Sequence, residues 1–382
     1  MRILHTSDWH LGRSLHRADL RQAQADFAEH LVSTVRAERI DVVLVAGDVY
    51  DRAVPPVDAV ALFEETLIRL REAGARVILI SGNHDSARRL GCNAPLIDAA
   101  GVHLRTHPEA LLEPVMLTDD HGPVAVYGVP YMEPATRGER SHAAVFADAV
   151  ARIRADAAQR DVRRTIVMAH AWVAGGEPSE SERDIAVGGV GQVPVSLFDG
   201  FSYVALGHLH GQQTLDDHLR YSGSPLPYSF SEANHKKGSW LVELGGGGLG
   251  RVERVPAPVW KKLAVLRGTL ADLLTSDSYA HNADDFVAVT LTDTVRPDAP
   301  MDRLRTRFPH VLVLDFRPEG VAVDDRSYGA RVAGRDDLQI AAEFVRHVRG
   351  GPPSEPERAL LAQAFDAVRT GGVELCGRTG WK

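Results

Sequence analysis

The sequence predicts an α/β protein with a mixed two-sheet core, outer helices, a small α+β module and C-terminal helices. Short apolar runs alternate with helix-period segments through the first 170 residues, a spacing typical of a largely parallel sheet. Shorter strands then predominate as far as residue 255. A content of 44% hydrophobic and 25% charged residues is ordinary for a globular protein with a sizeable core.

The amino-terminal part predicts three strands joined by two amphipathic helices. The strands are RILHTS (residues 2–7), DVVLVAG (41–47) and ARVILIS (75–81), and the helices run from about 19 to 37 and from about 55 to 73. Because a strand–helix–strand unit places its two strands side by side and parallel, these three strands are expected to share one sheet.

Five further apolar runs predict the remaining strands of the core. They are VAVYGVP (124–130), RTIVMAHA (164–171), FSYVALG (201–207), LRYSGSP (219–225) and GSWLVELGGGGLGRVERV (238–255). The last run predicts a hairpin whose turn is the glycine stretch 245–248.

Three regions are expected along the chain, namely residues 1–255, 256–330 and 331–382. The boundary is the proline-containing stretch PAPVW (256–260), which is typical of a linker. Beyond it, helix-like and strand-like runs alternate over about 65 residues, which predicts a small α+β module.

The last region predicts two amphipathic helices, residues 336–349 and 354–370, separated by GGPPSEP. Ser354, followed three residues later by Glu357, predicts a capping box at the start of the second helix. Helices beyond a complete core either pack on it or dock onto a partner, and their pattern alone leaves both roles open.

Composition points to a cytoplasmic protein. The longest apolar runs are of strand length, so no membrane span is expected, and the amino terminus lacks a signal-peptide pattern. Cys92 and Cys376 form neither a CxxC motif nor a disulfide framework. The net charge of −8 argues against binding nucleic acid through overall basicity, although divalent metals can supply positive charge locally.

Side chains with metal-binding chemistry follow every strand predicted in the first 210 residues except VAVYGVP. They are Asp8 and His10, Asp48 and Asp51, Asn83 and His84, His170, and His208 and His210. Each alone has an ordinary explanation as a turn or helix cap. Because the carboxyl ends of strands in open α/β sheets share one edge, we expect all five strand ends to meet in one crevice.

The ligand types select the chemistry of this crevice. Imidazole and carboxylate without thiolate favour Mn, Fe or Zn over a structural zinc cage. Seven candidates (Asp8, His10, Asp48, Asn83, His170, His208, His210) are too many for one ion and fit a pair ~3.5–4 Å apart that clamps an in-line displacement at phosphorus. Asp48 is the expected bridging carboxylate. His208 and His210, at i and i+2 of an extended segment, would serve one ion each.

His84 remains outside this ligand set. A histidine at this place can protonate the leaving oxygen or stabilise charge on the phosphorane. Asp51 is expected to hold its other ring nitrogen with the side-chain carboxylate, as carboxylates do for catalytic imidazoles. A salt bridge with Arg52 or a helix cap is the alternative role for Asp51.

The motifs D-x-H, GD-x-x-D, GNHD, a strand-end histidine and GH-x-H, in this order, resemble the calcineurin-like metallophosphoesterases. Within them, MRILHTSDWHLGR, AGDVYDR, ISGNHDS, GGVGQVPVSLFDGFSYVALGHLH and RYSGSPLPYSFSE resemble the SbcD subfamily, the nuclease subunits of bacterial SbcCD complexes. The resemblance is strong over residues 1 to about 245 and weaker through the small module. It implies an αββα core with a capping domain.

The resemblance also implies site roles and partners. One Mn²⁺ ion would be held by Asp8, His10, Asp48 and His210, and a second by Asp48, Asn83, His170 and His208, with His84 as the catalytic histidine. A homodimer would bind an SbcC-like ABC-type coiled-coil ATPase through the C-terminal helices. The activity would be an ATP-dependent 3′–5′ double-strand exonuclease and a single-strand or hairpin endonuclease.

Two features qualify the implied activity. The chain contains no G-x-x-x-x-G-K-[ST], so ATP dependence must come from the partner. Gly211 follows the GHLH motif where many relatives would carry a basic residue, so a phosphate charge is expected from Arg13, Arg52, Arg88 or Arg89 instead.

Two other function classes remain open. A phosphoesterase for small phosphodiesters or phosphoproteins could use the same metal core, although it would need neither the capping module nor the C-terminal helices. A non-catalytic subunit that tethers DNA ends would need no intact ligand set, whereas all seven candidates are present.

Overall fold

The computed structural model describes residues 1–139, 141–183, 185, 191–319, 334–349 and 351–370. The chain divides into two compact units, Met1–Leu263 and Ala264–Lys382. The expected boundary near residue 330 lies outside the described residues.

The first sheet contains the three strands expected at the amino terminus. Its order is β12–β11–β1–β2–β3–β4. The strands are β1 (Arg2–Thr6), β2 (Val42–Ala46), β3 (Arg76–Ile80), β4 (Val102–Leu104), β11 (Gly238–Gly245) and β12 (Gly248–Pro256). β1 to β4 are parallel, and the hairpin β11–β12 runs antiparallel beside β1. Helices α1 (Arg21–Glu38) and α2 (Val57–Glu72) make the two crossovers.

The second sheet has the order β5–β6–β7–β8–β10–β9. Its strands are β5 (Val115–Asp119), β6 (Gly122–Val129), β7 (Arg164–His170), β8 (Tyr203–Gly207), β9 (Gln213–Asp216) and β10 (Leu219–Tyr221). β6, β7, β8 and β10 are parallel, with antiparallel partners at both edges. Helix α5 (His142–Gln159) connects β6 to β7. Shorter helices are α3 (Ala87–Leu90), α4 (Ala94–Asp98), η1 (Pro108–Leu112), η2 (Pro134–Arg137), η3 (Val195–Phe198) and η4 (Phe230–Glu232).

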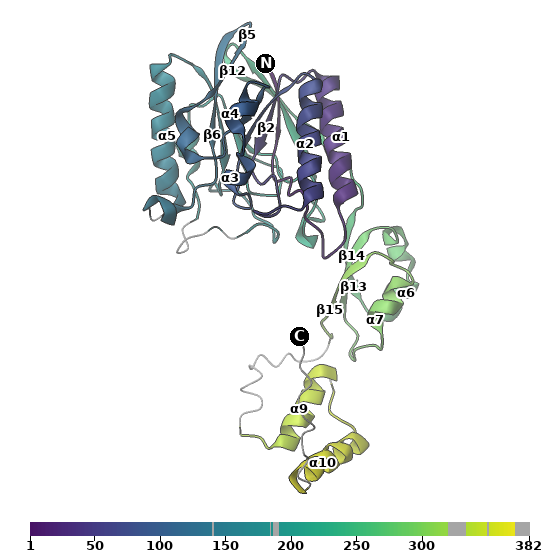
Figure 1. Ribbon diagram of the computed structural model, residues 1–382. Coiled ribbons are helices and arrows are strands. Elements are labelled where there is room, and N and C mark those ends of the chain that lie inside the picture. Colours follow the sequence, from purple (N-terminus) through teal and green to yellow (C-terminus); the bar gives the residue numbers. More distant parts are fainter. Residues whose placement is uncertain (140, 184, 186–190, 320–333, 350, 371–382) are drawn as a thin grey trace. The chain divides into compact units, whose positions relative to one another are not determined.

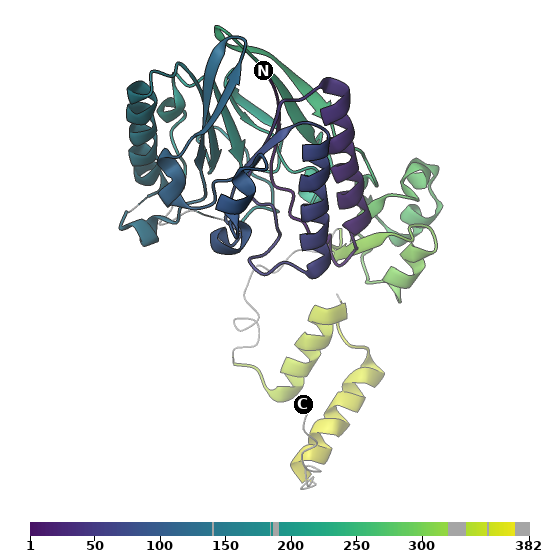
Figure 2. The same cartoon turned by 45° about the horizontal axis from the view of Figure 1, so that its top comes forward.

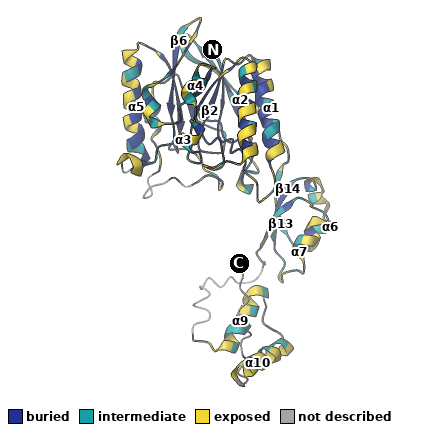
Figure 3. Cartoon of the chain, in the orientation of Figure 1, coloured by how far each residue is buried: buried dark blue, intermediate teal, exposed yellow. Residues whose placement is uncertain are grey.

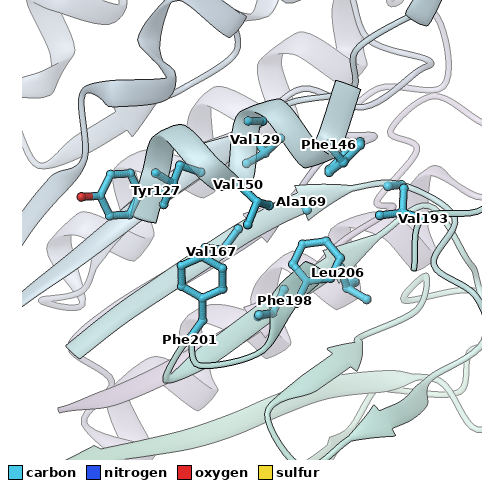
Figure 4. Close-up of a cluster of buried hydrophobic side chains, with 14 of the residues drawn as sticks. Tyr127, Val129, Phe146, Val150, Val167, Ala169, Val193, Phe198, Phe201 and Leu206 are labelled. Atoms are coloured by element: carbon cyan, nitrogen blue, oxygen red, sulfur yellow. The ribbon is translucent and has the colours of Figure 1, made fainter. Parts of the chain in front are cut away.

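The two sheets pack face to face between outer helices, with α1 and α2 on one side and α5 on the other (Figures 1 and 2). Alternation along the strands produces this layering: Ile3 belongs to the cluster between the sheets, whereas Leu4 belongs to the cluster under α1 and α2. Phe146 and Phe198 pack in the third cluster, between α5 and the second sheet (Figure 4). The expected α/β two-sheet core is therefore confirmed, and its strands are dark with burial in Figure 3.

The second unit begins with the small α+β module. A three-stranded sheet of order β13–β14–β15 comprises Leu263–Gly268, Phe286–Leu291 and Val311–Phe316. It packs with α6 (Leu270–Thr275), η5 (Asp277–Asn282) and α7 (Pro300–Arg305) around buried Leu273, Val289 and Phe308. The strand β13 was not expected from the sequence.

Two further helices, α9 (Asp337–Arg349) and α10 (Glu355–Thr370), match the expected C-terminal pair. The Glu357 carboxylate accepts from the backbone N–H of Ser354 at 2.7 Å, as the capping box predicts. Phe344 and Val348 of α9, and Leu360 and Val368 of α10, remain more than half exposed. Across the described part of the chain, no helix is long and apolar enough to cross a membrane.

Candidate metal centre

The carboxyl ends of strands from both sheets meet at one edge of the core. Nδ1 of His170, at the end of β7, donates to the carbonyl oxygen of Ala46, at the end of β2, at 2.9 Å. A Cβ on Gly207 would lie 2.0 Å from the same carbonyl oxygen, and a Cβ on Gly82 would lie 2.1 Å from Oδ1 of Asp48. Because glycine has no Cβ, the backbone at Gly207 can lie against Ala46, and the backbone at Gly82 can lie against Asp48.

The expected site residues come together at this edge, and all of them are buried except Asp51 and Asn83, which are partly buried. Donor atoms within 4.8 Å of one another form three overlapping groups: Asp8, His10 and His210; His10, Asp48 and His84; and Asp8, Asp48 and His170. Asp8, His10 and Asp48 each occur in two of the groups. Residues about 200 positions apart in the sequence thus converge as the parallel-strand argument requires.

Four of these residues have a left-handed backbone that L-residues rarely adopt: φ is 53° at Asp8, 45° at His10, 48° at Asp48 and 106° at His208. Such conformations cost about 1–3 kcal/mol each and cluster at functional sites. Here they end the strands and turn the side chains into the crevice. The sequence-based expectation of an extended GHLH segment is therefore wrong at His208, where the backbone turns.

One half of the centre contains His10 and His210. Their Nε2 atoms lie 3.0 Å apart, and Oδ2 of Asp48 lies 3.6 Å from Nε2 of His10. Both rings are buried. Oδ1 of Asp8 accepts from the backbone N–H of His208 at 3.0 Å, which ties this half to the GHLH loop.

The other half contains Asn83, His170 and His208, and its contacts suit a cation. The Ala46 carbonyl can only accept, so Nδ1 of His170 carries the ring proton and Nε2 offers a lone pair. Burial lowers the pKa of His170 to about 4, which keeps the ring neutral. Yet Nε2 faces Oδ1 of Asn83 at 2.9 Å. Two acceptors facing each other in a buried site fit a cation bound by both.

The pKa shifts of the other candidate ligands also favour a bound cation. Burial, followed by the nearby Asp48 carboxylate, raises the pKa of Asp8 well above its usual value, and burial also raises the pKa of Asp48. Burial lowers the pKa of His10 and His208, whose neighbouring imidazoles add to the effect. Neutral imidazoles and carboxylates that repel one another form a donor set stabilised by divalent cations.

His84 lies beside this donor set and is held by the main chain. Its Nδ1 donates to the carbonyl oxygen of Asp51 at 2.7 Å, and its backbone N–H donates to Oδ1 of Asp48 at 2.8 Å. The expected contact from the Asp51 carboxylate is therefore made by the Asp51 carbonyl instead. Oδ1 of that carboxylate lies 3.6 Å from Nε of Arg13 and 3.8 Å from Nδ1 of His10.

Two arginines flank His84. Burial lowers the pKa of His84, the Asp48 carboxylate opposes this, and the guanidiniums of Arg183 and Arg13 lower the pKa further. Arg13 was among the arginines expected to meet a phosphate, whereas Arg183 was not. Of the others, Arg89 donates to the carbonyl of Ala53.

Asp85, the last residue of GNHD, was not predicted as a site residue, although its place directly after the candidate ligands was a usable signal. Its carboxylate accepts three backbone N–H groups: Oδ2 from Val49 at 3.1 Å and from Gly82 at 2.9 Å, and Oδ1 from Tyr50 at 2.9 Å. Asp85 thereby joins the loops that follow β2 and β3, which carry Asp48 and His84.

Residues 1–212 match the calcineurin-like phosphoesterase family. The chain belongs to this family. Residues 259–349 match the SbcD C-terminal family, described as the type 5 capsule protein repressor C-terminal domain. The two matches together confirm the SbcD-type resemblance given by the sequence motifs.

Solved structures similar to this chain include TT1561 of Thermus thermophilus, with 18% identity, a TM-score of 0.39, and coverage of 67% of this chain and 98% of that one. GAP50, the anchor in the inner membrane complex of Plasmodium, has 11% identity, a TM-score of 0.38, and coverage of 85% and 99%. A dimetal phosphatase from Danio rerio has 14% identity, a TM-score of 0.37, and coverage of 67% and 98%.

Family and donor set agree on the general chemistry. The phosphoesterase match and the three His/Asp groups support a metal-dependent phosphoesterase that uses divalent cations. The enzyme is thus a hydrolase of phosphate esters.

Asp85→Asn tests how the loops are held. An amide offers one acceptor oxygen where the carboxylate offers two, so at least one buried N–H among Val49, Tyr50 and Gly82 loses its partner. We expect the free energy of unfolding to fall by about 1–3 kcal/mol, measured by urea denaturation of the metal-free protein. Unchanged stability would contradict this role. Asp199→Asn, at an exposed position, serves as the control.

Proposed function

We propose that this protein is the DNA nuclease subunit of an SbcCD-type repair complex and hydrolyses phosphodiester bonds with two divalent ions, Mn²⁺ by preference. The observation that supports the proposal is the position of Asp48 between two sets of candidate ligands, within a chain that also matches the SbcD C-terminal family. One set has His10 beside His210, and the other has Asn83 beside His170 and His208. Oδ2 of Asp48 lies 3.6 Å from Nε2 of His10 and 3.5 Å from Nε2 of His170, one in each half.

In this proposal Asp8, His10 and His210 hold one ion, Asn83, His170 and His208 hold the other, and Asp48 bridges them. When bound, the ions supply Lewis acidity and positive charge for an in-line displacement at phosphorus. The protein's own contribution is orientation. Main-chain contacts fix His170 and His84, and the carboxylates of Asp8 and Asp48 accept from backbone N–H groups of the loops that carry the other ligands.

His84 is proposed as the catalytic histidine. Because the Asp51 carbonyl accepts from Nδ1, the second nitrogen, Nε2, is free of that bond. A donor atom of this ring lies within 4.8 Å of donor atoms of His10 and Asp48. In this proposal Nε2 donates a proton to the leaving oxygen when the ring is protonated, or stabilises charge on the phosphorane through a hydrogen bond. Asp51 is a positioning residue that acts through its carbonyl.

We propose that Arg13 and Arg183 contact the phosphate backbone, in place of a basic side chain at position 211. Both guanidiniums lie close enough to His84 to influence its pKa. Arg183 is exposed, and NH1 of Arg183 lies 3.5 Å from the Asn83 carbonyl oxygen. Arginine is suited to this role because its planar fork binds phosphate oxygens bidentately.

The C-terminal helices are proposed to dock on the coiled coil of an SbcC-like ATPase, which would supply the ATP dependence of the double-strand exonuclease. Their exposed Phe344, Val348, Leu360 and Val368 provide apolar area for a helical partner. A homodimer within a heterotetramer and a cytoplasmic location complete the proposal.

Co-purification tests the docking role of these helices. We expect the tagged full-length chain to recover a large ATPase, and we expect the Phe344→Glu variant to lose that ATPase.

Substrate comparison tests the activity. Purified protein with Mn²⁺ should cleave hairpin and single-stranded DNA faster than a cyclic nucleotide or a chromogenic diester. Turnover of a small ester without cleavage of DNA would favour the small-phosphodiester alternative. Metal binding with no turnover of any of these substrates would favour a DNA-tethering subunit.

His84→Ala separates chemistry from folding. We expect metal content to stay close to wild type, because the side chain lies outside the proposed ligand set. The protein should remain folded, although losing the buried ring and its bond to the Asp51 carbonyl lowers thermal stability. Cleavage of hairpin DNA should fall by about 10²–10⁴-fold, the usual contribution of a general acid. Metal content by elemental analysis and single-turnover rates provide the two measurements. Near-wild-type cleavage would remove His84 from the mechanism.

Arg183→Gln tests the phosphate contact. A charge-assisted hydrogen bond to phosphate is worth about 1.5–3 kcal/mol, so kcat/KM for DNA should fall roughly 10-fold or more at low salt. The difference from wild type should shrink as salt rises, because the contact is exposed and screened. Arg152→Gln, an exposed arginine of α5, is the matched control and should cleave like wild type.

A further inference from the structure

A buried side-chain network surrounds His210 on the side away from His10. Nδ1 of His210 lies 2.5 Å from Oγ of Ser181, and Oγ of Ser181 lies 2.6 Å from Oε1 of Glu232. Lys237 makes an ion pair with Oε2 of Glu232 and donates to the carbonyl oxygen of His210 at 2.8 Å. Glu232 is 1% exposed.

The partners in this network fix the positions of its protons. The carboxylate of Glu232 forms a buried ion pair with Lys237, which favours its ionised form, so it only accepts hydrogen bonds. The hydroxyl of Ser181 therefore donates to Glu232, and its oxygen accepts from Nδ1–H of His210. This tautomer leaves the lone pair on Nε2, the nitrogen that lies 3.0 Å from Nε2 of His10.

The main chain of His210 is held by the same residues and their neighbours. Lys237 bonds the His210 carbonyl, and Oε1 of Glu182 accepts from the His210 backbone N–H at 2.7 Å. Nζ of Lys237 also donates to Oγ of Ser224 at 2.9 Å. An imidazole held through both its ring and its backbone has few orientations left, and that preorganisation strengthens metal binding.

The two halves of the centre differ in how their histidines are oriented. Nδ1 of His170 donates to a main-chain carbonyl at the end of a strand, so its orientation is built into the sheets. Nδ1 of His210 depends on a hydroxyl, a carboxylate and an ammonium from two loops. Side-chain substitutions can therefore weaken the His210 half while the His170 half stays intact.

We propose that Ser181, Glu232 and Lys237 are positioning residues that hold His210 in the Nδ1-protonated form and set the affinity of the metal ion on the His10–His210 side alone. This inference rests on the two-metal centre proposed above. It assigns a role to the loop that contains Ser181 and to the SFSE motif, in which Glu232 lies.

Titration of Ser181→Ala with Mn²⁺ alone tests the proposal. Isothermal titration calorimetry should show one Mn²⁺ site unchanged and the other weakened by about 10–100-fold, the usual effect of losing such a partner. Electron paramagnetic resonance at one to two equivalents should show more isolated Mn²⁺ and less of the coupled pair. Ser181→Thr, which keeps the hydroxyl, should restore both. Equal weakening of both sites, or of neither, would overturn the proposal.

Glu232→Gln provides a second route and a matched control. Asp156 on α5 also accepts from a hydroxyl, that of Tyr127 at 2.8 Å, and from a cation, Arg160 at 2.6 Å, but it contacts no candidate ligand. Asp156→Asn should change thermal unfolding without changing Mn²⁺ binding, whereas Glu232→Gln should weaken the same single Mn²⁺ site as Ser181→Ala. If Glu232→Gln and Asp156→Asn bind Mn²⁺ alike, Glu232 is only structural and the proposal is wrong.

The wild-type titration distinguishes the two levels of inference. Fewer than two Mn²⁺ ions bound to wild type would refute the two-metal centre, and the positioning proposal with it. If wild type and Ser181→Ala each bind two Mn²⁺ ions with the same affinities, only the positioning proposal is refuted. Should Ser181→Ala fail to fold, the comparison of Glu232→Gln with Asp156→Asn decides the question.

Discussion

The close approach of two sheet edges is the constraint on which the metal centre depends. Nδ1 of His170 donates across the gap between the sheets to the carbonyl of Ala46. Position 207 lies so close to the same carbonyl that only glycine fits there. This contact joins a strand of the second sheet to a strand of the first at their carboxyl ends. Ligands from either sheet alone would form half a centre, so the register of β2 against β7 and β8 decides whether the halves meet.

Building a site at this edge is costly, and the structure shows what offsets the cost. Left-handed backbone at Asp8, His10 and Asp48 stores strain, and burial disfavours the charged carboxylates. The same carboxylates accept backbone N–H groups of the neighbouring loops, as Asp8 does from His208 and Asp48 does from His84. These bonds hold the loops and favour the ionised carboxylates that a divalent cation needs.

The strands that carry the ligands could be predicted from the sequence because two simple rules coincide. Buried parallel strands are continuous apolar runs, and their carboxyl ends share one edge, so the polar residue after each run marks the site. Asp8, Asp48, His170 and His208 follow this pattern. The prediction missed β4, which is only 3 residues long, and the edge strands β5, β9 and β13, which alternate in burial instead of forming apolar runs.

Contacts made by loops and main chain could not be predicted in this way. The sequence suggested that the carboxylate of Asp51 would hold His84, but a carbonyl makes the contact, and any residue type supplies a carbonyl. Ser181, Arg183 and Glu232 lie in segments without helix or strand periodicity, so no pattern placed them near His210 or His84. Asp85 could have been predicted, because it directly follows the candidate site residues Asn83 and His84, but its partners are backbone N–H groups that carry no sequence signal.

The loop of residues 177–183 contacts both a candidate metal ligand, His210, and an arginine proposed to bind phosphate, Arg13. Its Ser181 contacts His210 through the hydroxyl, while the Ser181 carbonyl accepts from NH2 of Arg13 at 2.9 Å. Arg13 stacks on the ring of Tyr228, the residue whose backbone N–H donates to Glu232. NH1 of Arg13 has no hydrogen-bond partner within the described residues, so this arginine can donate to a phosphate while NH2 stays bonded to the Ser181 carbonyl. Ser181 therefore contacts both the arginine proposed to bind phosphate and the histidine proposed to bind metal, and its substitution would disturb the two together.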